Sequence, residues 1–239
     1  MRKLFQNNEI LFAVLWIVIY VLSFSNADML SEAIGMPKLI TVIVGAILSV
    51  ILLLFAKKND LLAYLGLCPA KVAAKNVLYW IPLAVITAVN LLCPFAQGQN
   101  VLTAILGVIS MCFVGFLEEL IFRGLLFKAM CRDNVKTAIL VSSLTFGVGH
   151  IVNLLTGAPL LETLLQLAYA AAVGFCFTAV FYVSGSIFPC IVSHAVTNSL
   201  SVFVDTPSPL VLILTSALLI VLGLGYGLWM LRRGKADNP

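Results

Sequence analysis

The stretch that decides the fold is Val114–Phe127, VGFLEELIFRGLLF, where two adjacent carboxylates and an arginine interrupt an apolar run long enough to cross a membrane. A charge near the centre of a membrane helix costs about 2.5–3.5 kcal/mol on insertion scales, so these side chains need compensating partners. Glu119 and Arg123 are four residues apart, which predicts an ion pair on one helical face. Glu118 points about 100° away and has no local partner. Because ionisable residues inside a membrane mark functional sites, Glu118 is the first candidate.

The composition of the whole chain indicates a membrane protein. The 239 residues are 62% hydrophobic and only 10% charged, with a mean hydropathy of +1.12. A soluble domain carries about 25% charged residues. We therefore predict an all-α, polytopic membrane helix bundle that lies in a lipid bilayer. The net charge of +4 then reports on topology, and no nucleic-acid partner is expected.

Eight apolar segments are long enough, or nearly so, to cross a bilayer at about 20 residues per crossing. They are residues 9–25, 38–56, 77–93, 101–127, 137–155, 163–183, 187–204 and 209–231. We predict about eight transmembrane helices in a single integral membrane domain, residues 1–239, with a motif-bearing core at 101–204. The first segment has some features of a signal peptide, but we favour a retained helix.

The distribution of basic residues predicts the orientation. Of the 14 Lys and Arg residues, Arg123 lies inside a predicted span, and only Lys38 falls in a loop on the side opposite the N-terminus. The rest all fall on the side of the N-terminus, as the positive-inside rule requires if both termini are cytoplasmic. Short loops and the absence of any N-x-S/T sequon favour a bacterial plasma membrane.

The only two histidines, His150 and His194, both lie inside predicted spans. Phe146 and His150 share a helical face, as do His194 and Asn198, because each pair is spaced i to i+4. At about 1.5 Å per residue, Glu118, His150 and His194 lie roughly 15, 20 and 10 Å from the predicted cytoplasmic ends of their helices. A carboxylate, two imidazoles and an amide in one layer form a candidate catalytic cavity.

Three motifs in this order carry a family resemblance. They are EExxxR at Glu118-Glu119-Arg123, FxxxH at Phe146-His150 and HxxxN at His194-Asn198. Together they resemble the signature of the CPBP (CAAX protease and bacteriocin-processing, or Abi) family of intramembrane endopeptidases, which includes the type II CAAX prenyl endopeptidases. No motif position departs from the pattern, and the predicted number of spans also fits that family.

The resemblance implies a hydrolytic mechanism and a role for each residue. Glu118 and His150 would hold and deprotonate a water, and His194 and Asn198 would stabilise the oxyanion. Glu119 with Arg123 would support the site as an ion pair, and Phe146 would pack beside His150. The substrates implied are membrane-associated peptides, either prenylated C-terminal peptides or the leaders of bacteriocins and signal peptides.

Several alternatives stay open at this point. No cofactor is required, but Glu118, His150 and His194 form a known zinc ligand set, so a divalent metal such as zinc is a second reading. The sequence has neither an HExxH nor a GxSxG motif, which disfavours zincin and serine mechanisms. The same polar residues could instead serve a proton- or ion-coupled transporter, or be dispensable in a non-catalytic scaffold, immunity or regulatory factor.

Overall fold

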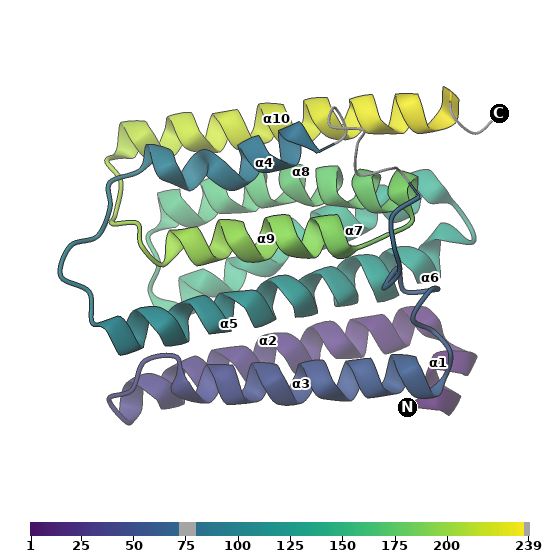
Figure 1. Ribbon diagram of the computed structural model, residues 1–239, viewed down its shortest axis with the longest axis horizontal. Helices are drawn as coiled ribbons and strands as arrows, with labels where there is room; N and C mark the ends of the chain where they lie inside the picture. Colours follow the sequence, from purple (N-terminus) through teal and green to yellow (C-terminus); the bar gives the residue numbers. More distant parts are fainter. Residues whose placement is uncertain (72–79, 237–239) are drawn as a thin grey trace.

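The computed structural model describes residues 1–71 and 80–236, with side chains to residue 233. It is a bundle of roughly parallel and antiparallel helices whose common axis lies horizontally in Figure 1. The elements are α1 (Arg2–Asn7), α2 (Glu9–Ala33), α3 (Leu39–Lys58), α4 (Ile81–Ala88), η2 (Val89–Leu92), α5 (Val101–Glu119), η3 (Leu120–Phe127), α6 (Lys128–Cys131), α7 (Val135–Gly149), η4 (His150–Thr156), α8 (Leu160–Ser184), α9 (Phe188–Ser201) and α10 (Pro209–Ala236). The prediction of an all-α membrane bundle is confirmed.

Asparagine side chains start three of these helices. Asn8 accepts a hydrogen bond from the backbone N–H of Leu11 at the start of α2, Asn134 does so at the start of α7, and Asn100 accepts from two backbone N–H groups of α5. Each cap satisfies amide donors that a helix otherwise leaves unpaired at its first turn. The long apolar runs therefore begin at residues that the local sequence specifies.

Among the residues that the structure describes, six helices are long and apolar enough to cross a membrane. The count of eight is not confirmed, because the segments predicted at 77–93 and 187–204 correspond to shorter helices. Within the described residues the first of these runs from Ile81 to Leu92, and residues 77–79 lie outside the described part. The second, α9, has 14 residues, which span about 21 Å of a hydrocarbon core about 30 Å thick. Helix α9 ends at Ser201, and the chain then pairs Val204 with Phe95 in an isolated β-bridge.

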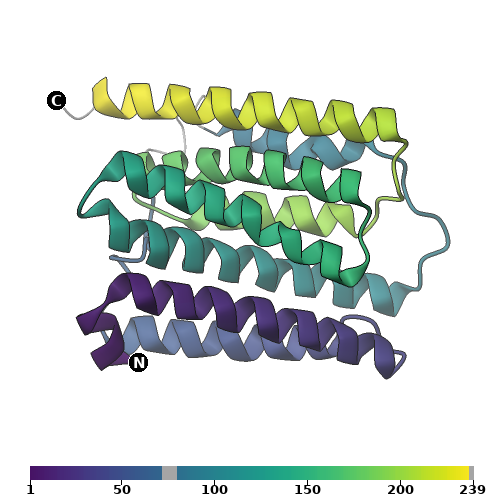
Figure 2. The ribbon, with the colours of Figure 1, turned by 180° about the vertical axis from the view of Figure 1, so that it is seen from behind.

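The helices are layered so that the motif-bearing ones lie inside. Helices α2 and α3 form a pair along one face of the bundle and α10 covers the opposite face, in both views (Figures 1 and 2). Between them, α5 packs against α9 and α7 packs against α8. All three sequence motifs therefore lie on helices enclosed by the outer pair and α10.

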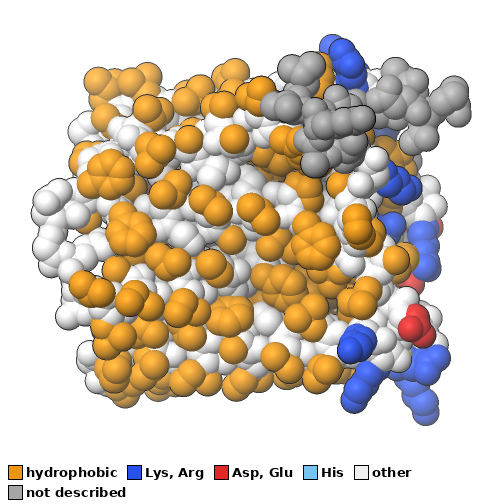
Figure 3. Space-filling view, in the orientation of Figure 1, with side chains coloured by type: hydrophobic (Ala, Val, Ile, Leu, Met, Phe, Trp, Pro, Cys, Tyr) orange, Lys and Arg blue, Asp and Glu red, His pale blue; other side chains and the backbone are white. Residues whose placement is uncertain are grey.

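The surface agrees with a membrane location. Hydrophobic side chains cover the flank of the bundle seen in Figure 3, and Lys and Arg gather at one end. The N-terminus and the C-terminal end of α10 both lie at that same end (Figure 1). The protein is thus an integral membrane protein, and the Lys and Arg side chains visible on this face lie at one end of it. The cytoplasmic location of that end stays a prediction.

Candidate active site

A buried ion pair lies at the centre of the site. Arg123 donates from Nη1 to Oε1 of Glu119 over 2.9 Å, and both side chains are 0% exposed. Arg123 also donates from Nη2 to the carbonyl oxygen of Gly174 on α8, 3.0 Å away, and its guanidinium lies 4.4 Å from the ring centroid of Phe146. The pair expected from the i,i+4 spacing is present, and the arginine links α8 to the motif helix.

The backbone changes from α-helix to π-helix directly after Glu119. All eight residues of this π-helical segment, η3, are buried, including Arg123. Such segments are rare and occur often at functional sites, because an extra residue per turn redirects the side chains that follow. Hydropathy and spacing in the sequence give no sign of it.

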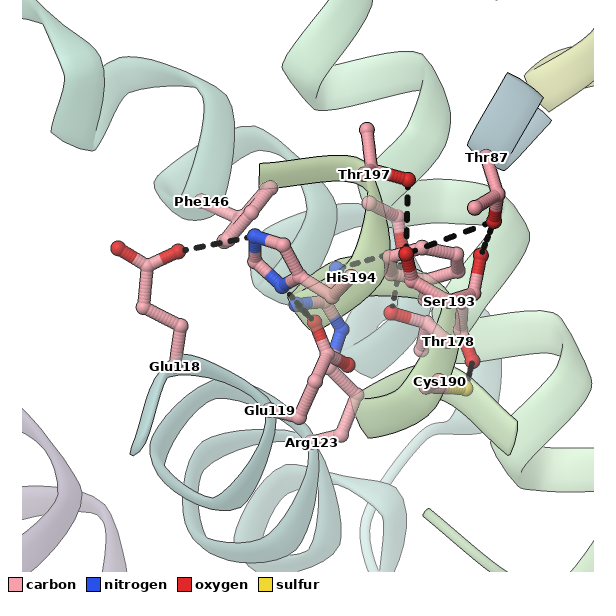
Figure 4. Close-up of polar contacts among 12 residues, drawn as sticks. Thr87, Glu118, Glu119, Arg123, Phe146, Thr178, Cys190, Ser193, His194 and Thr197 are labelled. Atoms are coloured by element: carbon pink, nitrogen blue, oxygen red, sulfur yellow. Dashed lines mark hydrogen bonds and ion pairs between the residues drawn. The ribbon is translucent and has the colours of Figure 1, made fainter. Parts of the chain in front are cut away.

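His194 lies between the two glutamates (Figure 4). Its Nδ1 is 2.8 Å from Oε1 of Glu119, and its Nε2 is 3.5 Å from Oε2 of Glu118. An ionised carboxylate only accepts hydrogen bonds, so Nδ1 of His194 carries a proton and donates it to Glu119. Oε1 of Glu119 therefore receives hydrogen bonds from both Arg123 and His194, which fixes the imidazole of α9 against α5.

Glu118 has a partner that the sequence does not reveal. The hydroxyl of Tyr20, on α2, donates to Oε1 of Glu118 over 2.7 Å. The expectation that Glu118 has no local partner holds only within its own helix, because Tyr20 is 98 residues away in the chain. One carboxylate oxygen thus faces α2 and the other faces α9.

His150 is the first residue of η4 and is oriented by the backbone. Its Nδ1 is 3.1 Å from the carbonyl oxygen of Phe146. A carbonyl oxygen only accepts, so Nδ1 carries the proton and Nε2 of the neutral ring is left as an acceptor. The ring of Phe146 lies edge-on to His150 at 5.4 Å and to His194 at 5.7 Å between centroids. Phe146 thus contacts both imidazoles.

Two cavities meet at these residues. The larger, about 890 Å³, is lined by Glu118 and His150 and runs along α2. The smaller, about 80 Å³, is lined by His150, His194 and Asn198. Phe146 and His150 line both cavities, so Glu118 lies in one and His194 with Asn198 in the other of two neighbouring cavities that share these two side chains. This arrangement fits acid–base chemistry on a bound molecule.

The zinc ligand set is not assembled in this site. Among the described residues, no group of three or more His, Cys, Asp or Glu side chains is placed to hold a metal ion. His194 turns both ring nitrogens toward carboxylates, and His150 commits Nδ1 to a backbone carbonyl. These donors do not converge on one point, so they do not fit a zinc ion in this arrangement.

Two glycines that the sequence analysis missed allow the site helices to approach closely. A Cβ on Gly174 would lie 3.0 Å from Nη2 of Arg123, and one on Gly115 would lie 2.7 Å from the backbone N of Ala195. The run of small residues at 170–172 before Gly174 is the one sequence signal of close helix packing here. Tyr20 carries no such signal.

Replacing Gly115 by Ala is expected to destabilise the protein by about 1–3 kcal/mol, because the new methyl group meets the backbone of α9 beside His194. Thermal unfolding in detergent measures this. The matched control is Gly225→Ala on α10, where nothing lies within 4 Å of the added Cβ and the change is neutral or slightly stabilising. Equal melting temperatures for the two variants would show that α5 and α9 do not pack this closely.

Comparison with known proteins agrees with the motifs. Residues 100–200 match the family model described as "Type II CAAX prenyl endopeptidase Rce1-like". Searches of curated proteins and of solved structures returned no match. The matched residues include every motif position, from Glu118 to Asn198, and the match supports the resemblance to the CAAX protease family.

Proposed function

We propose that this chain, whose residues 100–200 match the Rce1-like model of the CAAX protease family, is an intramembrane endopeptidase that uses water activated by Glu118 and His150. The family supports intramembrane protease activity and peptide substrates in a membrane. One observation carries the assignment of residues: Glu118 of α5, His150 of η4, and His194 and Asn198 of α9 line two cavities that share His150.

The base is supplied by Glu118 and His150. Glu118 is held as an acceptor by Tyr20, and His150 has Nε2 available as an acceptor because Nδ1 donates to Phe146. A water between them loses a proton as its oxygen attacks the scissile carbonyl carbon. The same proton then goes to the leaving amide nitrogen as the C–N bond breaks, so the products are a carboxylic acid and an amine.

The oxyanion is stabilised from α9. Glu118, Glu119 and Arg123 together carry one net negative charge, and a doubly protonated His194 would neutralise it. Such a ring donates Nδ1–H to Glu119, and its Nε2–H lies at an ion-pair distance of 3.5 Å from Glu118. That longer contact leaves the Nε2–H able to turn to a developing oxyanion, beside the amide of Asn198 one helical turn away. Glu119 and Arg123 act through His194 and are positioning residues.

The substrates belong to one of two classes. Both prenylated C-terminal peptides and the leaders of bacteriocins or signal peptides are membrane-associated, and both fit an intramembrane site. The larger cavity, about 890 Å³, has the volume of a typical ligand-binding site and is lined by Glu118. A library that contains both classes distinguishes them.

Cleavage of quenched fluorescent peptides by the purified, lipid-reconstituted protein tests the proposal. Asn198→Ala is expected to lower kcat by about 10²–10³-fold, the usual effect of removing one oxyanion donor. Asn26→Ala is the matched control, because that exposed side chain only donates to the carbonyl of Leu22 on α2. Unchanged cleavage by Asn198→Ala would remove Asn198 from the proposed oxyanion site.

A further inference from the structure

We propose that Tyr20 is a positioning residue for the reaction, holding the carboxylate of Glu118 in the orientation that a base requires. This inference rests on the proposed function. Tyr20 belongs to α2, outside the residues 100–200 that match the family model, and no sequence motif contains it. The site would therefore depend on a helix that lies outside the matched residues.

The contact is short and enclosed. The 2.7 Å hydrogen bond from the Tyr20 hydroxyl reaches Oε1 of Glu118, and Tyr20 is only 7% exposed. The Tyr20 ring is held by Phe24, one turn further along α2, at 4.6 Å between centroids. Helix α2 itself packs against η3, the segment that follows Glu118 and Glu119. The donor thus has little freedom to leave the carboxylate.

The two oxygens of Glu118 have different neighbours, and this gives the hydrogen bond its function. Oε1 accepts from Tyr20 on α2, while Oε2 faces His194 on α9. These contacts from opposite sides limit the rotation of the Glu118 carboxylate, which lines the same cavity as His150. A phenol that donates to a carboxylate favours its ionised form, which is the form that acts as a base.

Other groups near Glu118 do not duplicate this role. The charged or titratable side chains around it are Tyr20, Asp28 and Glu32 on α2, His150 on η4, and His194 with Glu119 and Arg123. Asp28 is occupied by Lys38, 2.9 Å away, and by Thr41. Glu119 and Arg123 pair with each other and with His194. Tyr20 alone among the described residues donates a hydrogen bond to Glu118.

The chain contains a second tyrosine–glutamate pair that serves as a control for the Tyr20→Phe variant. Tyr64 donates to Oε2 of Glu9 over 2.6 Å, a tyrosine–glutamate pair of the same chemistry near the N-terminus. Neither Tyr64 nor Glu9 lines the two cavities of the site. Tyr64→Phe therefore removes the same kind of hydrogen bond without touching Glu118.

The experiment measures kcat/KM against pH for the library peptide that the wild type cleaves fastest, with thermal unfolding alongside. Tyr20→Phe is expected to lower kcat/KM about tenfold at neutral pH and to move the acidic limb of the profile up by about one pH unit. The shape of the profile does not depend on the fraction of folded enzyme. Incorporating 3,5-difluorotyrosine at position 20 keeps the ring and strengthens the donor, so the acidic limb should move to lower pH.

Each outcome decides the inference. A wild-type profile for both position-20 variants, or an equal shift in Tyr64→Phe, would overturn it. If Tyr20→Phe does not fold, the fluorinated variant decides alone. A shift of its acidic limb to lower pH supports the inference, and no shift or a shift to higher pH rejects it. Loss of cleavage in Glu118→Gln together with a wild-type profile in Tyr20→Phe would reject this inference and leave the proposed function standing. A wild type that cleaves no peptide, or a Glu118→Gln variant with full activity, would overturn both.

Discussion

Replacing Glu118 by Gln is expected to lower kcat by about 10²–10⁴-fold while the melting temperature changes by only a few degrees. The amide oxygen of Gln can still accept from Tyr20, so the contact between α2 and α5 persists. An amide cannot take a proton from water, and general-base catalysis contributes about 10²–10⁴-fold. Peptide cleavage and thermal unfolding, measured on the same preparation, separate the two effects.

Glu9→Gln is the control for this variant. Glu9 accepts a hydrogen bond from Tyr64 and pairs with Arg132 over 2.9 Å, so its replacement also alters a glutamate with a tyrosine partner. We expect it to cleave at the wild-type rate. Cleavage by Glu118→Gln at that rate would refute the assignment of the base and return Glu118 to a role in packing or transport.

Replacing Arg123 by Met is expected to destabilise the protein by about 3–5 kcal/mol, the usual cost of leaving a buried charge without its partner. Glu119 is 0% exposed and would keep only His194, 2.8 Å away, as a side-chain hydrogen-bond partner among the described residues. The variant would also lose the hydrogen bond to Gly174, which joins η3 to α8. The free energy of unfolding, measured with denaturant in detergent micelles, gives the size of the effect.

The double variant Glu119→Gln with Arg123→Met tests whether the unpaired buried charge of Glu119 causes this loss of stability. It removes both charges and also Nε of Arg123, a buried atom that has no hydrogen-bond partner among the described residues, while the Gln side chain keeps the shape of the glutamate. Most of the lost stability should therefore return, because replacing both members of a buried pair is often nearly neutral. Activity should stay low, since His194 loses the carboxylate that orients it. A double variant less stable than Arg123→Met would show that the charge itself is not the cause.

Much of the bundle follows from local sequence. The length of the apolar runs predicted the long helices, and the i,i+4 spacing of Glu119 and Arg123 predicted their ion pair. The grouping of His150, His194 and Asn198 around one small cavity also agrees with the prediction of a single layer. These features depend on helix period and hydrophobic length, both of which are visible within a few turns of sequence.

The remaining features depend on contacts between distant segments. Tyr20 looks like any other aromatic residue of an apolar helix, and only the packing of α2 beside η3 brings it to Glu118. The π-helical segment leaves the hydropathy unchanged. The short helix α9 was predicted as part of a longer span because the apolar run continues past Ser201, where the backbone turns to pair with Phe95. Sequence pattern alone cannot anticipate these tertiary effects.

The central claim is that this chain hydrolyses a peptide bond inside the membrane with water activated at Glu118. The most direct measurement is mass spectrometry of library peptides incubated in H₂¹⁸O with the lipid-reconstituted wild type and with Glu118→Gln. We expect the wild type to place one ¹⁸O atom in the new carboxyl group of a cleaved peptide and Glu118→Gln to yield no product above background. Intact peptides with the wild type, or equal ¹⁸O incorporation by both proteins, would contradict the claim.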